Sequence, residues 1–131
     1  MRYTNNGIYT KVRKAVKDAY SSANVTQTYA PTPSKFPTVF VREVGHFTPP
    51  VTASFSNAQD ISESTWEAQV FSNKTSGAKE QAYGIMDSVK SAFRKMYFIE
   101  TFEAPLDQNT TYFVLVARFR RIIGSGETIP T

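Results

Sequence analysis

The segment from Thr111 to Ile123, TYFVLVARFRRII, constrains the fold more than any other part of the sequence. Alternate residues of a strand face opposite sides of the sheet. One face of this strand is then wholly apolar, with Phe113, Leu115, Ala117 and Phe119. The other begins apolar and becomes cationic, with Tyr112, Val114, Val116, Arg118 and Arg120. We therefore expect the first face to pack against helices.

Two interpretations of the mixed face remain open. It is either an outer sheet face whose end lies in solvent, or a surface that meets another subunit. In the second case Tyr112 and Val114 are covered, and the arginines at 118, 120 and 121 contact acidic partners or a lumen that holds DNA. Arginine suits such contacts because its planar guanidinium group binds carboxylate or phosphate bidentately.

The rest of the chain alternates between strand-like and helix-like patterns. Apolar residues recur at helical spacing in two segments, 8–20 and 76–97. Strand patterns occupy 25–29, 38–45, 64–73, 98–104 and 111–123. The 131 residues fit one domain. We therefore predict a single α+β domain over 1–131, in which one mostly antiparallel sheet packs against both helices on one face.

The second helix has two notable small residues. Ser76 is placed to cap its start, because a hydroxyl can accept a hydrogen bond from a free backbone N–H group. Gly84 lies inside the helix, where glycine costs about 1 kcal/mol relative to alanine. Its presence indicates close packing at that point.

The segment from His46 to Ser64 has weak secondary-structure signals, with Pro49 and Pro50 near its start. We expect a long loop or arm here, and a loop this long in a small domain is usually functional or disordered. His46, Phe47 and Phe55 are the candidate contact residues of this arm. Gly124 and Gly126 are expected to begin a flexible tail over 124–131.

Several classes of chemistry lack the residues they need. The chain has no cysteine and one histidine, His46, and no partner set surrounds that histidine in the sequence. It has no phosphate-binding glycine motif either. We expect no enzyme activity, no catalytic residue, no metal and no cofactor. No apolar run approaches the ~20 residues of a membrane span, and the N-terminal segment lacks the apolar region of a signal peptide.

The first helix has a basic side. Its cations are Lys11, Arg13, Lys14 and Lys17, and the whole chain has a formal net charge of +4. A solvated helix face explains this pattern most simply. The alternative is a contact with phosphates, in which each cation adds to a salt-dependent affinity for nucleic acid.

The order of these elements resembles the tail-terminator, or tail-completion, proteins of long-tailed bacteriophages, which belong to the head–tail joining proteins. An amphipathic helix precedes a proline-marked strand, KFPTVFVREVG, and a polar loop then leads to the strand STWEAQVFSN. The helix SGAKEQAYGIMDSVKSAFRKMYF runs directly into a strand, and the last hairpin closes on TTYFVLVARFRRII. The resemblance covers about Ile8 to Ile123 and lies in the arrangement rather than in one exact motif.

The resemblance implies a structural virion protein, assembled in the host cytoplasm. It implies a homo-oligomeric ring, typically a hexamer, that caps the tail tube and joins it to a head–neck connector protein. Genomic DNA would pass through the lumen, and no membrane is involved. The 46–64 arm would then reach a neighbour or the tube protein. The alternatives are another neck component, such as a stopper or adaptor, and a small nucleic-acid-binding module.

Overall fold

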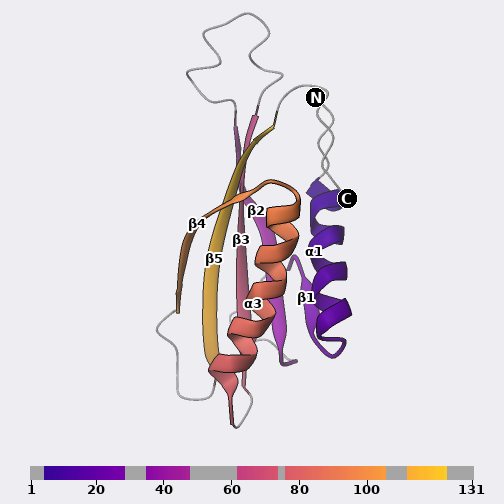
Figure 1. The fold of residues 1–131 in the computed structure, drawn as a ribbon, viewed down its shortest axis with the longest axis vertical. Helices are drawn as coiled ribbons and strands as arrows, with labels where there is room; N and C mark the ends of the chain where they lie inside the picture. The colour runs from indigo at the N-terminus through magenta and orange to yellow at the C-terminus, as the bar shows by residue number, and fades with distance from the viewer. Residues whose placement is uncertain (1–4, 29–34, 48–61, 74–75, 106–111, 124–131) are drawn as a thin grey trace, which may run out of the picture.

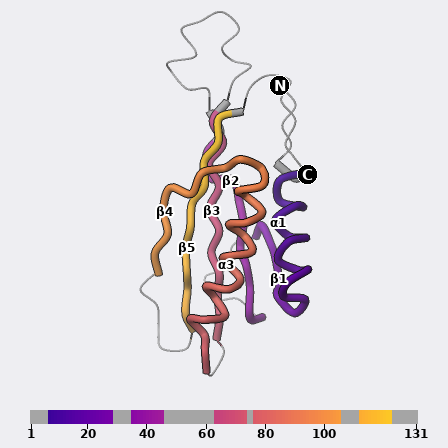
Figure 2. Tube along the Cα trace, viewed as in Figure 1, coloured from indigo at the N-terminus to yellow at the C-terminus, as the bar shows by residue number. Residues whose placement is uncertain are grey.

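The computed structural model describes residues 5–28, 35–47, 62–73, 76–105 and 112–123 (Figure 1). The elements in chain order are α1 Asn5–Ala19, β1 Asn24–Thr26, β2 Thr38–Phe47, β3 Ser62–Ser72, α3 Ala78–Lys95, β4 Ile99–Pro105 and β5 Phe113–Ile123. The five strands form one sheet in the order β1-β2-β3-β5-β4. Both helices lie on the same side of it, as Figure 2 also shows. The predicted α+β class, with one sheet against two helices, is confirmed.

The sheet is mixed rather than purely antiparallel. Strand β1 pairs with β2 in parallel, whereas β2 with β3, β3 with β5, and β4 with β5 are antiparallel. The predicted hairpin of β4 and β5 is present. Helix α3 connects β3 to β4 and passes over the sheet, so that β5 lies between β3 and β4.

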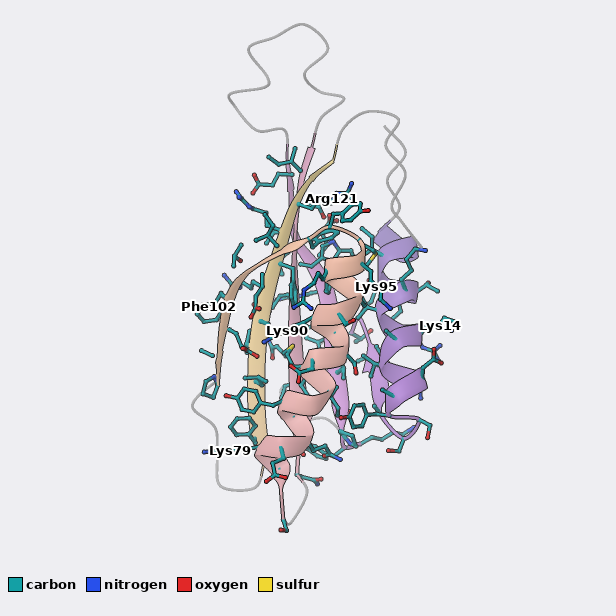
Figure 3. The ribbon with its side chains drawn as sticks, in the orientation of Figure 1. Lys14, Lys79, Lys90, Lys95, Phe102 and Arg121 are labelled. Atoms are coloured by element: carbon teal, nitrogen blue, oxygen red, sulfur yellow. The ribbon has the colours of Figure 1, made fainter. Side chains whose placement is uncertain are left out.

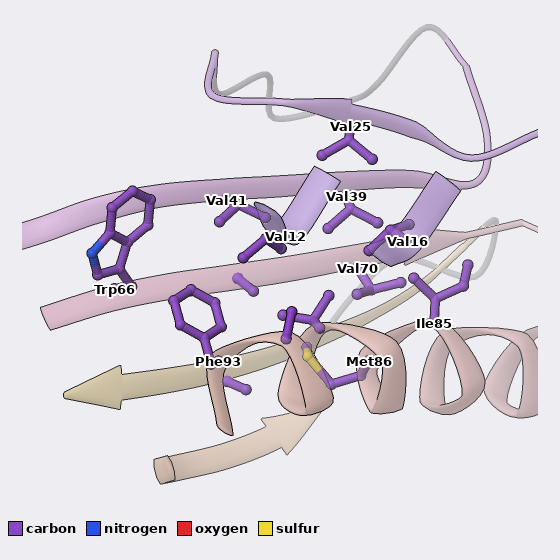
Figure 4. Packing of buried hydrophobic residues seen from close by; sticks show 14 of the residues in the cluster. Val12, Val16, Val25, Val39, Val41, Trp66, Val70, Ile85, Met86 and Phe93 are labelled. Carbon is purple, nitrogen blue, oxygen red and sulfur yellow. The ribbon is translucent and has the colours of Figure 1, made fainter. Parts of the chain in front are cut away.

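The core lies between the sheet and the two helices (Figure 4). Strand β5 contributes the four apolar residues that the alternation assigns to this face, from Phe113 to Phe119. Phe93 of α3 stacks on Phe119 with ring centroids 4.4 Å apart, and the ring of Trp66 lies 6.0 Å from that of Phe93. These rings supply large apolar areas, and their burial is the main favourable term in folding.

Helix α3 begins differently from the expectation. The residue before it is Gly77, with φ of 84°, and no side chain caps the helix, so the predicted capping by Ser76 is wrong. A left-handed backbone suits glycine, and it turns the chain into the helix without a capping side chain. The expected close packing at Gly84 is confirmed, because a Cβ atom there would collide with the hydroxyl group of Tyr20.

Strands β2 and β3 extend further than the sequence indicated. His46 pairs with Ser64 and Phe47 with Glu63, so the predicted loop over 46–64 is too long at both ends. A register shift between Glu43 and Gly45 interrupts the alternation, which explains why the strand signal fades there. Phe55 and the tail over 124–131 lie outside the described residues.

Candidate interaction site

The face of the sheet opposite the helices carries paired charges in its centre. Arg42 of β2, Glu67 of β3 and Arg118 of β5 are direct neighbours across the three strands. The Nε atom of Arg118 donates to Oε2 of Glu67 at 3.0 Å, and Nη2 of Arg42 lies 3.9 Å from Oε1. Gln69 donates to Oε1 of Glu67 at 3.1 Å. We call these four residues the charge ladder.

The ladder is asymmetric in its burial. Glu67 is 6% exposed, whereas the side chains of Arg42 and Arg118 are half exposed. A buried carboxylate requires partners because its desolvation is costly. The ladder therefore ties Arg118 to its own sheet, while leaving part of the guanidinium group accessible to a neighbour.

The three arginines of β5 have different surroundings. Arg120 lies on the same face as Arg118, and its Nη1 atom is 3.7 Å from Oε1 of Glu63. Arg121 points to the helix side, is buried, and donates from Nη1 to the backbone oxygen of Met96 at 2.6 Å. The sequence pattern places the three arginines together at the cationic end of the strand. In the structure, only Arg118 and Arg120 belong to the mixed face.

A small apolar cluster adjoins the ladder on the same face. It consists of the buried Phe71, Val114 and Val116, with Phe36 and Tyr112 packed against them. The ring of Tyr112 lies 5.7 Å from that of Phe36 and 5.9 Å from that of Phe71. Val114 is thus covered within this chain, and its burial needs no second subunit.

Strand β4 forms an edge of the sheet and exposes two large apolar side chains. Ile99 and Phe102 are 62% and 48% exposed, and Ile122 of β5 is 51% exposed (Figure 3 labels Phe102). A register shift between Glu100 and Phe102 brings Ile99 and Phe102 opposite Arg120 and Arg118, on the face of the ladder. Sequence reasoning missed this surface because simple alternation puts Ile99 and Phe102 on opposite faces.

The other face of β4 is held to α3 by the charge of Lys90, which Figure 3 labels. Nζ of Lys90 lies 2.7 Å from Oε1 of Glu103 and 3.5 Å from Oε2 of Glu100. Burial alone lowers the pKa of Lys90, but the hydrogen bonds and charges of Glu103 and Glu100 outweigh it, so the pKa is raised. This cluster fixes the edge strand from behind.

The basic side of α1 adjoins a groove of about 400 Å³ between the two helices. The groove is lined by Lys11, Lys14, Ala15, Asp18, Ser91, Ala92, Lys95 and Met96. Lys14 pairs with Asp18 at 2.9 Å, and Lys17 donates to the backbone oxygen of Ser21 at 3.5 Å. Arg13 is exposed. Of the four helix cations, Lys11 and Lys14 therefore line this groove, on the side of the sheet that carries the helices, whereas Arg118 and Arg120 belong to the opposite face.

His46 and Phe47 end β2, beside Ser64 and Glu63, and the arm that they were expected to begin lies outside the described residues. Within the part of the chain that the structure describes, no group of three or more His, Asp or Glu residues could hold a metal ion. None of the described helices is long and apolar enough to cross a membrane.

A scan against models of known protein families and a search of curated proteins find no match to this chain.

Proposed function

We propose that this chain is a structural subunit of a tail-terminator ring in a long-tailed bacteriophage, where it caps the tail tube and joins it to the neck. The single observation that carries the proposal is the composition of the face opposite the helices. Half-exposed arginines there lie beside the exposed Ile99, Phe102 and Ile122. Arginine and large apolar side chains exposed together are typical of protein–protein contacts.

The two helices support the same interpretation, because they complete the core on one side only. The domain buries its largest rings between α1, α3 and the sheet. Among the described residues, the one buried apolar cluster on the other face is the small one around Phe71. Neither described helix covers that face, which supports a role for it in contact with a neighbouring subunit or with the tube protein.

The test is the position of the chain in a particle. Phage particles assembled with an affinity-tagged copy would be purified and imaged by electron cryomicroscopy. We expect density for a ring between the last ring of the tube and the neck. A ring on the portal side would favour a stopper or adaptor, and particles that lack the chain would overturn the virion role.

A nucleic-acid-binding module is the second candidate, and the lysine-lined groove between α1 and α3 favours it. Each phosphate contact would contribute to a steep fall of affinity with salt. Tight binding of duplex DNA by a monomer, lost in a Lys11→Gln, Lys14→Gln and Lys95→Gln variant, would support the module. Weak binding with a shallow salt dependence would count against it.

A further inference from the structure

A second hollow lies at the C-terminal end of α3, with a volume of about 350 Å³. It is lined by Tyr97, Ile99, Arg120, Arg121 and Ile122, and we call it the Tyr97 pocket. Tyr97 is 70% exposed, more than the neighbouring Ile99 and Ile122. An exposed apolar surface of this kind, beside two arginines, marks an interaction site.

The backbone of Tyr97 is strained. Its φ angle is 64°, in the left-handed region that bulky residues rarely adopt. The backbone N–H of Tyr97 donates to Arg94 at 2.9 Å and that of Phe98 to Phe93 at 2.9 Å, which is the arrangement that usually ends a helix on glycine. Glycine would make this turn with less strain. A tyrosine is therefore retained here at a cost in stability, which points to a use for its exposed ring.

The two arginines of the pocket are held in place by their own chain. Arg121 donates to the backbone oxygen of Met96, and its guanidinium carbon lies 5.6 Å from the centre of the Tyr97 ring. Arg120 lies near Glu63. Groups that are fixed in advance lose little entropy on binding. The side chain of Arg120 is half exposed and 3.7 Å from Glu63, so its guanidinium group keeps N–H donors for a further carboxylate. With the exposed Tyr97 ring beside it, the pocket suits a protein surface that carries both acidic and aromatic side chains.

Such a surface lies towards the other end of the same helix. Glu80, Tyr83 and Asp87 are exposed and lie on one side of α3, because residues three, four and seven positions apart share a helix face. We call them the acidic stripe. Neither carboxylate forms an ion pair with another described residue, whereas Arg94 and Lys95 add positive charge to the last turn of α3. The helix dipole accounts for Glu80 and for the two cations, but not for two exposed tyrosines or for Asp87.

We propose that the Tyr97 pocket of one copy receives the acidic stripe of a second copy, so that subunits join head to tail along α3. The helix rises about 1.5 Å per residue, so Glu80 and Tyr97 are about 25 Å apart along its axis and cannot meet within one chain. Figure 3 shows Lys79 and Arg121 near the two ends of α3. A head-to-tail contact closes into a ring when its rotation fits. This inference rests on the proposed role as a ring subunit and names its contact.

Addition of a strand at the edge of β4 is the competing way to join two copies. The register shift between Glu100 and Phe102 breaks the regular row of backbone groups along β4. Irregular edges of this kind discourage strand pairing between molecules. A contact through side chains at the Tyr97 pocket does not need a regular edge.

A charge swap tests the contact directly. One variant carries Glu80→Lys together with Asp87→Lys, and the other carries Arg120→Glu. Sedimentation and native mass spectrometry measure the assembly of each variant alone and of an equal mixture of the two. Each variant alone should need at least about tenfold more protein to assemble, since like charges then meet. The mixture should assemble like the wild type, because in alternating subunits every pocket meets a stripe of opposite charge. Failure of the mixture to assemble would overturn the contact.

Tyr97→Gly separates the contact from the stability of the fold. It relieves the left-handed strain and removes the ring, so we expect an unchanged or higher thermal midpoint together with weaker assembly. The control is Phe102→Tyr, which keeps an exposed ring on the same sheet face outside the pocket and should leave assembly unchanged. Normal assembly of Tyr97→Gly would contradict the proposal.

Disulfide trapping gives an independent result, since the chain has no cysteine. Ile99→Cys and Tyr83→Cys are prepared separately, mixed and oxidised. We expect a covalent dimer in the mixture and little in either variant alone. A dimer of Ile99→Cys alone would instead show a two-fold contact and overturn the head-to-tail arrangement.

The outcomes distinguish this inference from the proposed function. A wild-type protein that stays monomeric at high concentration, or that binds single-stranded DNA through Tyr97, overturns the contact. Particle imaging then decides the virion role by itself. Conversely, a trapped head-to-tail dimer from a protein that particles lack would support the contact and reject the tail-terminator role.

Discussion

On the face of the sheet that carries the helices, Trp66 and Phe119 are neighbours in register and are buried against Phe93. One residue along the same two strands, on the opposite face, Glu67 is the neighbour of Arg118. The two pairs lie on the same two strands, one residue apart, and their side chains point to opposite faces of the sheet. At this register position one face therefore holds packed aromatic rings, whereas the other holds a carboxylate between two guanidinium groups.

The difference shows how one strand can serve both stability and contact. The residues of β5 that face the helices contribute to the core, and a change there alters the fold. Substitutions of the residues that face away change the surface at a lower cost in folding stability, provided that Glu67 keeps its partners. The predictions below test this division, from the largest expected effect to the smallest.

Phe119→Ala should have the largest effect on stability. It removes a ring that is 1% exposed and stacked on Phe93, and such changes cost about 3–5 kcal/mol. The matched change on the other face is Phe102→Ala, which should cost under about 1 kcal/mol because its ring is half exposed. Urea unfolding of both variants measures the difference. Equal losses would mean that the two faces contribute alike to the fold.

Arg118→Gln should come second. It leaves the buried Glu67 carboxylate with Gln69 and the more distant Arg42, at an expected cost of about 1–2 kcal/mol. Reversal to glutamate is a poorer test of assembly at Arg118 than at Arg120. It would place a second carboxylate against the buried Glu67, which Arg118 contacts at 3.0 Å, whereas Glu63 is 3.7 Å from Arg120. Arg120→Gln breaks a longer pair with Glu63 and should cost about 0.5 kcal/mol or less. A larger loss for Arg120→Gln than for Arg118→Gln would contradict the ladder.

The helix-covered side was predictable from the sequence because its signals are periodic. The residues from Phe113 to Phe119 alternate without interruption, and each one faces the core as expected. The stripe of α3 is equally regular, and its buried residues are Ala82, Ile85, Met86, Val89, Ala92 and Phe93. Hydrophobic burial acts on every member of such a pattern, so the pattern alone indicates the face.

The candidate site was less predictable because two irregular positions determine it. The register shift after Glu100 moves Phe102 to the face of Ile99, and no residue type in this segment predicts that shift. The left-handed turn at Tyr97 lacks the glycine that usually marks it. The burial of Arg121 also depends on the end of α3, because its partner is the backbone oxygen of Met96. Arg118 and Arg120 were found because simple alternation holds on β5.

Gly84→Ala tests how closely the helix layer is packed. Alanine favours a helix over glycine by about 1 kcal/mol, but its Cβ would collide with the Tyr20 hydroxyl. In the wild-type background we expect no gain in stability, or a loss. In a Tyr20→Phe background the collision is removed, and the same change should stabilise by up to about 1 kcal/mol. Thermal unfolding of the wild type, the two single variants and the double variant measures the coupling between positions 20 and 84. An equal effect of Gly84→Ala in both backgrounds would contradict the contact.

Alkaline pH should lower the folding stability through groups on the helix-covered side alone. This is the smallest effect that we expect. Tyr9 donates from its hydroxyl to the backbone oxygen of Val25, and burial raises its pKa above 10.0, although Arg13 lowers it. The raised pKa of Lys90 likewise exceeds 10.5. Both groups keep a proton in the folded chain that the unfolded chain releases, so their contribution is complete below about pH 10 and is lost as pH rises further.

The charge ladder supplies the contrast, because guanidinium groups stay protonated throughout this range. Thermal midpoints measured from about pH 8 to 11.5 should therefore fall at the alkaline end. The fall should be shallower in a Tyr9→Phe variant, which cannot ionise at this position, and unchanged in Arg120→Gln, whose removed charge does not titrate there. If Arg120→Gln flattened the curve and Tyr9→Phe did not, the alkaline loss would arise on the face opposite the helices, and the division between the two faces would be wrong.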